Sequence, residues 1–353
     1  MEIKGKFAKI DIKASIVDEA TLAQLQAIAD NVHYSNTKIV VMPDTHAGAE
    51  CVIGFTMQYD PHTPIINPNI VGVDISCGML VQPLGKVDLD FKKFDATVQG
   101  LVNSEKCMEF ENDFYAEVDT QDKPFEYHNR QIGTLGFGNH FVEVDADADG
   151  EKYLVIHTGS RHLGYRVCNY YAKKCMQGIL CSGDDVKFYL HDMGLVQQYA
   201  SLNRAVLMDA ILSAYGASYD KALRFETLHN YIDLERHIIR KGAISAQKGE
   251  QVLIPLNMRD GSVICTGKGN ADWNWSAPHG AGRVMSRSEA KKKVTLEDYA
   301  KSMDGIYSTC INADTIDECA MAYKPSEVIL ADIQDTVEVH KVIKPIYNFK
   351  NSK

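Results

Sequence analysis

Apolar residues along the chain recur at two spacings, and each spacing predicts a different element. Over residues 18–32 they recur every three or four positions behind two acidic side chains, which predicts a helix with acids in its first turn. The same spacing over residues 185–215 predicts the longest helix, and residues 295–303 belong to a further helical segment. We expect the first of these helices to cover a sheet.

Short runs of β-branched and apolar residues predict buried strands that deliver polar loops. Residues 38–42, 51–57 and 70–75 form such runs, with Pro, Asp or Gly close to their ends. Residues 244–279 combine Gly, Pro and short apolar runs, which is typical of strands and functional loops.

An aspartate-rich segment separates two further apolar runs and predicts a hairpin. Residues 141–144 and 153–156 flank it, and its closing Asp-Gly pair is a strong turn signal. The turn brings His140 and His157 together at the open end of the ribbon, within reach of a shared ion. The segment resembles the start of a calcium loop, but Ile156 occupies the position of the bidentate glutamate, which excludes an EF-hand.

Composition is ordinary for a globular protein of 353 residues, with 45% hydrophobic and 24% charged residues. The nine cysteines lack the paired spacing of a disulfide framework, which fits a reducing compartment. No basic and apolar leader opens the sequence, and no apolar run approaches the roughly 20 residues of a membrane span. We therefore expect a cytoplasmic protein with no membrane segment.

Net charge is −10, so the chain as a whole has no electrostatic footprint of a nucleic-acid binder. Residues 259–293 differ, because seven basic side chains there outnumber three acidic ones. A phosphate-bearing polymer could be held at this segment. Alternatively, the lysines at 291–293 are the solvated face of a helix.

Five side chains of mixed ligand type predict a divalent metal centre. Asp74 and Cys77 lie three positions apart at the end of a run, and His140, His157 and His229 lie in similar polar settings. Each residue alone is more often a turn aspartate, a buried thiol or a satisfied histidine. The predicted helices and strands, with no obvious linker between them, indicate an α+β fold with one domain over residues 1–353, in which central β-sheets flanked by helices surround a metal-containing cleft.

His279 begins a glycine-rich pentapeptide that predicts a phosphate cradle. Gly280 and Gly282 let backbone amides approach an anion, and Arg283 offers a planar, permanently charged fork. A neutral imidazole held there can attack phosphorus once cations neutralise the phosphoryl oxygens. The alternative is a glycine-rich turn with a capping histidine.

Several familiar templates are absent. Residues 261–268 have the wrong glycine spacing for a phosphate-binding Walker loop, and Gly269 stands where Ser or Thr is needed. There is no His-Glu-x-x-His pair and no Cys-x-x-Cys, and neither Ser76 nor Ser160 has the glycine that precedes a nucleophile elbow. These absences argue against a zinc protease, a zinc finger and an α/β-hydrolase.

Taken together, the motifs resemble the RtcB-type RNA ligase family. The resemblance is ordered over residues 38–350 and includes residues 42–46, 268–270 and 322–324. Its main segments are Gly72-Val73-Asp74-Ile75-Ser76-Cys77-Gly78, Gly138-Asn139-His140-Phe141-Val142-Glu143, His157-Thr158-Gly159-Ser160-Arg161, His229-Asn230 and His279-Gly280-Ala281-Gly282-Arg283.

The resemblance implies a GTP- and manganese-dependent ligase that joins an RNA 3'-phosphate or 2',3'-cyclic phosphate end to a 5'-hydroxyl. It implies two Mn²⁺ per site, which Zn²⁺ or Co²⁺ could replace, although ligand softness alone favours zinc. The implied metal ligands are Asp74, Cys77, His140, His157 and His229, with the thiolate shared.

His279 would carry GMP as a covalent intermediate in RNA repair or tRNA splicing. The residues implied to contact the guanine nucleotide are Asn139, Glu143, Asn230, Asn257, Met258, Ser262, Gly280, Ala281, Gly282 and Lys350. Glu143 would accept from the base and Lys350 would donate to it. We expect a monomer whose partners are GTP and RNA ends.

One segment departs from the family pattern and keeps two alternatives open. Pro255-Leu256-Asn257-Met258-Arg259 stands where the family usually has Pro-Gly-Ser-Met-Gly, which adds bulk and charge beside the expected nucleotide. The first alternative is a metal-dependent phosphodiesterase or phosphatase that acts on RNA ends without ligation. The second is a catalytically silent, metal-containing RNA-binding relative.

Overall fold

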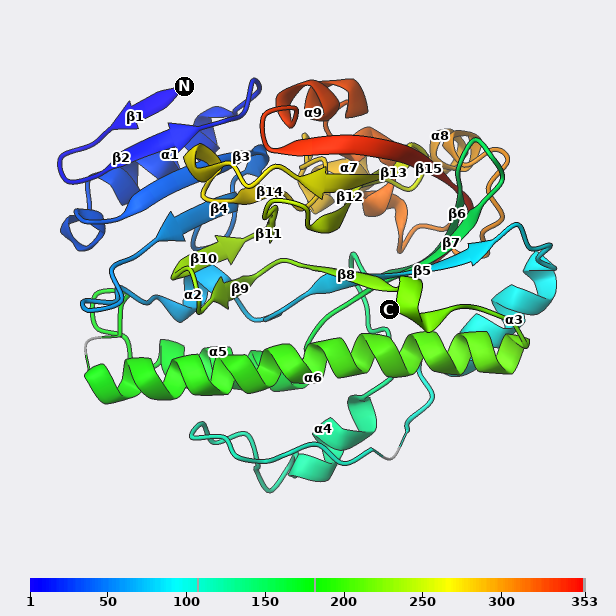
Figure 1. The fold of residues 1–353 in the computed structure, drawn as a ribbon, viewed down its shortest axis with the longest axis horizontal. Helices are drawn as coiled ribbons and strands as arrows, with labels where there is room; N and C mark the ends of the chain where they lie inside the picture. The colour runs from blue at the N-terminus through cyan, green and yellow to red at the C-terminus, as the bar shows by residue number, and fades with distance from the viewer. Residues whose placement is uncertain (107, 181, 352–353) are drawn as a thin grey trace.

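The computed structural model describes residues 1–106, 108–180 and 182–351. Their fold is α+β, as the sequence predicted, and it is built around two large sheets (Figure 1). In spatial order, the seven-stranded sheet contains β12 (Gln251–Asn257), β13 (Gly261–Gly267), β15 (Val337–Phe349), β6 (Phe141–Ala146), β7 (Lys152–Thr158), β5 (Gly78–Gly85) and β8 (Phe225–Leu228).

The second large sheet has six strands and contains most of the N-terminal part of the chain. Its order is β1 (Glu2–Lys4), β2 (Lys9–Ile12), β3 (Lys38–His46), β4 (Ile53–Gln58), β10 (Ile238–Lys241) and β9 (Tyr231–Asp233). Strands β2 and β3 are parallel, and β3 and β4 are antiparallel. A small ladder of β11 (Ala243–Ser245) and β14 (Ser276–Pro278) completes the described strands.

The long helix α6 (Gly183–Tyr215) confirms the strongest helical prediction. The Ser182 side chain caps its first turn by accepting from the Asp185 amide, and Gly216 ends it in the left-handed conformation. The helix packs against α3 (Phe91–Leu101), α5 (Arg161–Ala172) and strands β5 and β7. In Figure 1 it runs along the lower side of the molecule beneath the strands.

Shorter helices cover the remaining faces, and two were predicted: α1 (Glu19–Ala29) and α8 (Leu296–Ser302). The others are α2 (Pro68–Val71), α4 (Phe125–Gln131), α7 (Arg287–Lys293) and α9 (Ser326–Asp332). Five 3-10 turns are also described, at Val32–Tyr34, Lys221–Leu223, Ala271–Trp273, Ile316–Glu318 and Ala320–Ala322.

The predicted strand over residues 70–75 is wrong, because the short helix α2 and a turn occupy this stretch. Pro68 at the first helical position and the Asn67 side chain, which accepts from the Asn69 amide, favour a helical start. Gly72 then ends the helix with a φ of 88°. These local capping signals outweigh the β-branched composition of the run.

The predicted hairpin is confirmed by β6 and β7. Phe141 pairs with His157, and the Asp147 side chain closes the turn by accepting from the Asp149 and Glu151 amides. Val142 and Val144 on one face of β6 join the core under α3 and α6. The residues that alternate with these two valines lie on the opposite face of the strand. That face is therefore available to the functional site.

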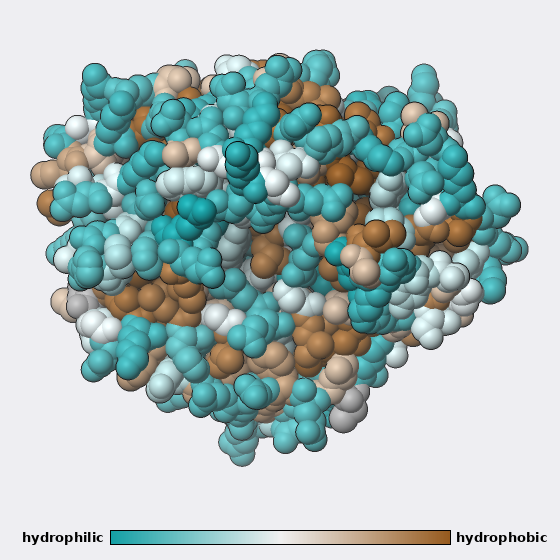
Figure 2. Space-filling model, in the orientation of Figure 1, coloured by the Kyte–Doolittle hydropathy of each residue, from teal (hydrophilic) through white to brown (hydrophobic). Residues whose placement is uncertain are grey.

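The surface in the orientation of Figure 1 is largely hydrophilic, with apolar residues in separate patches (Figure 2). Among the described residues, no helix combines the length and apolarity that a membrane crossing requires.

Candidate metal centre and nucleotide cavity

Four of the five predicted metal ligands lie at one edge of the seven-stranded sheet. His140 precedes β6, His157 lies near the end of β7, Cys77 precedes β5 and His229 follows β8. Neighbouring strands here are antiparallel, so the start of one strand lies beside the end of the next. The four residues therefore meet along the side of the sheet that is formed by these strand ends. The His229 amide donates to the Cys77 carbonyl at 2.8 Å, which fixes the two segments together.

The fifth predicted ligand, Asp74, joins them through a tight turn. Ser76 has a φ of 56°, and the Cys77 amide donates to the Asp74 carbonyl at 3.2 Å. The Ser76 amide donates to the Asn230 carbonyl at 2.8 Å, which ties this turn to the loop after β8. The turn thus aims a carboxylate and a thiol at the same point.

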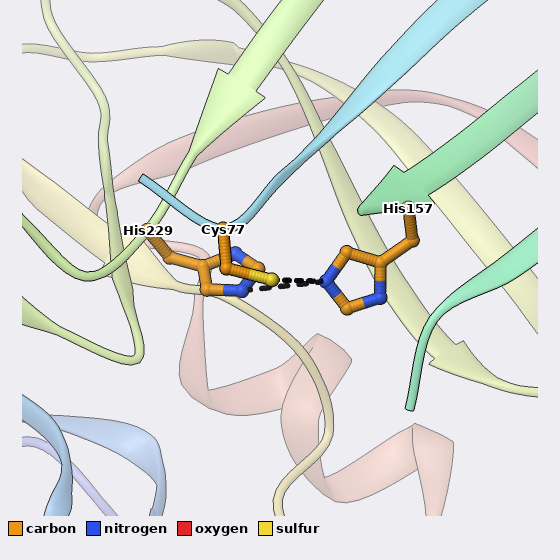
Figure 3. Close-up of side chains that lie close together, drawn as sticks. All are labelled: Cys77, His157 and His229. Carbon is orange, nitrogen blue, oxygen red and sulfur yellow. Dashed lines mark hydrogen bonds between the residues drawn. The ribbon is translucent and has the colours of Figure 1, made fainter. Parts of the chain in front are cut away.

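Cys77 is the centre of the cluster. Its Sγ lies 3.2 Å from His157 Nε2 and 3.4 Å from His140 Nε2. Figure 3 shows the Cys77 and His229 side chains meeting that of His157, and the Nε2 atoms of these two histidines are 3.4 Å apart. On the other side, His140 Nε2 is 3.0 Å from Asp74 Oδ2.

Backbone carbonyls orient two of the histidines. His140 Nδ1 lies 2.9 Å from the Leu135 carbonyl, and His157 Nδ1 lies 3.2 Å from the Asn139 carbonyl. Because a carbonyl only accepts, each Nδ1 carries the hydrogen and each Nε2 presents a lone pair to the cluster. A histidine that binds a metal is oriented in this way.

Burial favours the uncharged forms of His157, His229 and the Cys77 thiol. It lowers the pKa of His157 and His229 well below the usual value, and burial together with Asp74 raises the pKa of the Cys77 thiol. Burial opposes the charge on Asp74 as well, but the neighbouring His140 and Arg161 side chains hold the pKa of this carboxyl below its usual value.

This donor set fits divalent metal binding. Among the described residues, two groups of ligand atoms lie within 4.8 Å of one another: Cys77 with His157 and His229, and Asp74 with Cys77 and His140. Neutral imidazoles, a thiol and a carboxylate that converge in a buried space suit a transition-metal dication. Binding such an ion would stabilise the Cys77 thiolate and release its proton.

His279 lies beside the cluster, directly after β14. Its ring centroid is 4.8 Å from that of His229. Asp44, at the end of β3 and fully buried, accepts from His279 Nδ1 at 2.6 Å and from the His279 amide at 3.1 Å. This pair fixes the tautomer and leaves Nε2 as the free lone pair.

The backbone around this pair is closely packed. Lys324 Nζ donates to the Pro43 and Thr45 carbonyls, each at 2.9 Å, and so holds the chain on both sides of Asp44. Gly282 has a φ of 75°, and any side chain there would collide with the Asp44 carbonyl. Glycine is therefore required at this position for His279 to stay against Asp44.

A cavity of about 340 Å³ joins the metal cluster to His279. Its lining contains Asp74, Cys77, His157, His229 and His279, while His140 lies behind Asp74 and Cys77. All predicted nucleotide contacts except one also line it: Asn139, Glu143, Asn230, Asn257, Met258, Gly280, Ala281, Gly282 and Lys350. The exception is Ser262, which is fully buried in β13 outside the lining.

One end of the cavity carries a polar group of buried residues. Asn348 Nδ2 donates to Glu143 Oε2 at 2.6 Å, and Lys350 Nζ donates to the Asn139 carbonyl at 3.2 Å. Lys350 Nζ also lies 3.8 Å from Glu318 Oε2, and burial lowers the pKa of Lys350. This end therefore offers a hydrogen-bond acceptor and a hydrogen-bond donor among buried side chains.

Residues 256–259, which differ from the family pattern, add bulk to the cavity but do not add charge. Leu256 and Met258 are buried and line the cavity, and Met258 Sδ accepts from the Tyr299 hydroxyl at 3.5 Å. Arg259 does not line it, because its guanidinium pairs with Asp260 at 2.7 Å. The charge expected beside the nucleotide is thus neutralised at the surface.

Arg283 lines the cavity, but it is not a free fork for phosphate. Its guanidinium donates to the Asp317 carbonyl at 2.6 Å and to the Met285 carbonyl at 3.0 Å, and it lies 3.5 Å from a Glu318 oxygen. The lysines at 291–293 lie in the exposed part of α7, as the solvated-helix alternative anticipated.

Asp44 is the site residue that sequence reasoning missed. It lies 235 residues from His279, and the sequence marked it only as an aspartate at the end of a buried run, within the family-like segment 42–46. Its role becomes visible only when β3 and β14 are seen side by side.

Comparisons with known proteins identify a family for this chain. The family described as tRNA-splicing ligase RtcB matches residues 24–105 and 93–351. The RNA-splicing ligase RtcB of Escherichia coli K12 is 32% identical, over 87% of this chain and 88% of its own. The tRNA-splicing ligase RtcB of Aeropyrum pernix is 26% identical, over 93% and 89%. Because the match extends over most of the chain, this protein belongs to the RtcB family.

Proposed function

We propose that the protein is an RNA ligase that joins an RNA 3'-phosphate or 2',3'-cyclic phosphate end to a 5'-hydroxyl end, with GTP as co-substrate. One observation carries the proposal: His279, held by Asp44, lines the same cavity as four of the five candidate metal ligands. Membership of the RtcB family and the names of the relatives support the same activity. We further propose that the protein acts as a monomer in the cytoplasm.

In this proposal Asp74, Cys77, His140, His157 and His229 would hold two Mn²⁺ ions, and Cys77 belongs to both groups of ligand atoms. The two overlapping groups of ligand atoms support this number. Zn²⁺ or Co²⁺ could replace manganese, since imidazole and thiolate suit these ions well. When bound, the ions would supply Lewis-acid stabilisation of phosphoryl oxygens.

His279 is the proposed nucleophile. Its Nε2 forms a bond to the α-phosphorus of GTP while the bond from phosphorus to the pyrophosphate oxygen breaks, which leaves GMP on the histidine. Asp44 stabilises the positive charge that develops on the ring by accepting from Nδ1. A 2',3'-cyclic phosphate end is first opened by water, which breaks the bond from phosphorus to O2' and leaves a 3'-phosphate. The GMP then passes from His279 to an oxygen of the RNA 3'-phosphate as the phosphorus–nitrogen bond breaks, and the 5'-hydroxyl displaces GMP as the new phosphodiester forms.

The nucleotide would lie between His279 and the polar end of the cavity. Gly280, Ala281 and Gly282 would approach its phosphate, and Asn139, Asn230, Asn257 and Met258 would line its other sides. Glu143 would accept from the guanine N–H groups and Lys350 would donate to the guanine carbonyl oxygen. The contact of Ser262 with the nucleotide stays a prediction, because this residue is buried outside the cavity lining.

Covalent labelling tests the central step. Protein incubated with Mn²⁺ and GTP labelled at the α-phosphate should gain a covalent label. Acid should release this label, because a phosphorus–nitrogen bond is acid-labile. His279→Ala should gain none, whereas His340→Ala, at an exposed histidine on β15, should label like the wild type. Equal labelling of His279→Ala and wild type would contradict the mechanism.

A ligation assay separates the remaining alternatives. Defined oligonucleotides that end in 3'-phosphate, cyclic phosphate or 5'-hydroxyl are mixed with varied nucleotide and metal. Joining that requires GTP supports the ligase. Loss of cyclic phosphate without GTP and without joining would identify a phosphodiesterase or phosphatase. RNA binding with neither product would identify a silent relative. Tests of tRNA halves against damaged RNAs would then distinguish tRNA splicing from RNA repair.

A further inference from the structure

Asp145 on β6 is a buried carboxyl group for which the described residues provide no hydrogen-bond donor. It is fully buried, and both of its side-chain oxygens are unpartnered. The register places it opposite Tyr153 on β7 and Pro345 on β15. The Tyr153 hydroxyl and Lys341 Nζ both donate to Asp147 instead, at 3.1 and 2.7 Å. These two donors are therefore engaged by Asp147.

Glu143 shares a face of β6 with Asp145. The two residues are separated by one position, and side chains alternate along a strand. Val142 and Val144 point into the core on the helix side, so both carboxyl groups lie on the opposite face. Glu143 lines the cavity, and Asp145 lies next to it along the strand.

The two carboxyl groups are not equivalent. Glu143 receives a hydrogen bond from Asn348 at 2.6 Å and lies near the Lys350 cation. For Asp145, Glu143 is the only side chain among the described residues that affects the pKa. Burial raises the pKa of both groups, and the Glu143 charge raises the pKa of Asp145 further. An unpaired buried carboxylate is strongly disfavoured, so such a pair retains a proton. The better stabilised Glu143 is then the ionised partner.

We propose that Asp145 retains this proton and uses it to donate a hydrogen bond to Glu143, which keeps Glu143 ionised and fixed as the acceptor for a guanine base. This inference rests on the proposed function, in which Glu143 faces the nucleotide base. A carboxylate can accept two neighbouring N–H groups, as guanine offers, and it repels the ring-nitrogen acceptor that adenine presents. Asp145 is thus a positioning residue that sets base specificity through Glu143.

Two substitutions at Asp145 give opposite expectations. Asp145→Asn keeps a neutral donor of the same shape, whereas Asp145→Ala removes the donor. We would measure kcat/KM for covalent labelling with GTP and with ATP, and the affinity for GMP and AMP by calorimetry. The GTP-to-ATP ratio should stay within about threefold of wild type in Asp145→Asn and fall at least about tenfold in Asp145→Ala, as loss of a hydrogen bond to a charged group implies.

Asp147→Asn is the matched control, because Asp147 lies on the same ribbon and pairs with Lys341 outside the cavity lining. It should leave the ratio unchanged. Equal loss of the ratio in Asp145→Asn and Asp145→Ala would overturn the inference, since the charge would then be the active feature. An unchanged ratio in both would overturn it too. If Asp145→Ala does not fold, Asp145→Asn alone decides. An ionised Asp145 would require Asp145→Asn to lose the GTP-to-ATP ratio, whereas a protonated Asp145 lets this variant keep it.

Failure of the proposed function would look different. The wild type would then gain no covalent guanylate, and the inference would be judged by calorimetry alone. Equal affinity of the wild type for GMP and AMP would overturn it, whereas a preference for GMP that Asp145→Asn keeps and Asp145→Ala loses would sustain it.

Discussion

Replacing Asp44 with asparagine tests how His279 is held. Asp44 Oδ2 accepts from His279 Nδ1 at 2.6 Å and from the His279 amide at 3.1 Å, in a fully buried position. Asparagine keeps the shape of the side chain and removes its charge. The substitution therefore acts on the basicity and tautomer of the imidazole while the cavity keeps its form.

The size of the effect follows from the kind of bond that is lost. A hydrogen bond to a charged group contributes about 1.5–3 kcal/mol, and a neutral one about 0.5–1.5 kcal/mol. A difference of about 1–2 kcal/mol in the transition state slows guanylate formation about 5- to 30-fold. The loss is larger if the amide turns its NH₂ group toward Nδ1, because the proton then moves to the attacking Nε2.

Single-turnover labelling with GTP and Mn²⁺ measures this rate, with the concentration of GTP varied to separate binding from chemistry. The rate at saturating GTP should fall while the apparent affinity for GTP changes little. Asp192→Asn is the control: Asp192 is also fully buried, and it accepts from the Tyr115 and Ala116 amides outside the cavity lining. A wild-type rate in Asp44→Asn, or an equal slowing in both variants, would refute the reasoning.

Three further predictions concern the metal, a buried cation and acid stability. Cys77→Ser should lower bound manganese or zinc at least about tenfold by elemental analysis, whereas Cys51→Ser, at an equally buried thiol, should not; equal metal contents would contradict the shared-ligand role. Arg204→Met should lower the free energy of unfolding in urea by about 3–5 kcal/mol, because this fully buried guanidinium pairs with a carboxylate and two carbonyls; a loss below about 1 kcal/mol would contradict this role. Burial lowers the pKa of His162 from 6.5 to about 4, so the stability it contributes is present above pH 6.5 and is lost as the pH falls toward 4. His162→Phe should reduce the decrease in the free energy of unfolding between pH 6.5 and 4 by about 1–2 kcal/mol, a figure discounted for the partial exposure of His162. Equal decreases in the wild type and the variant would show that His162 is not the cause.

The convergence of two candidate metal ligands could be predicted from local signals. The Asp-Gly turn at residues 149–150 sets the register of β6 and β7, and this register alone brings His140 and His157 together. The long helix α6 was readable from its apolar spacing. Such features depend on residues near one another in the chain, where turn chemistry and periodicity act directly.

Contacts between distant segments could not be predicted in this way. The pairing of Asp44 with His279 depends on how two sheets are placed, and no spacing rule specifies it. The helix α2 was mistaken for a strand because hydrophobic composition was weighed above the capping residues Asn67 and Pro68. The resemblance to RtcB ligases suggested which residues meet, and it did not supply the contacts that orient them.

The position of β15 has a consequence for how the protein is made. This strand comes late in the chain, yet it lies between β13 and β6 in the middle of the seven-stranded sheet, and Lys350 follows it directly. A nascent chain cannot complete the sheet until residues 337–350 have left the ribosome. A product of premature termination before Val337 would expose two unpaired strand edges and lack Lys350. Incomplete chains should therefore be inert and prone to aggregation.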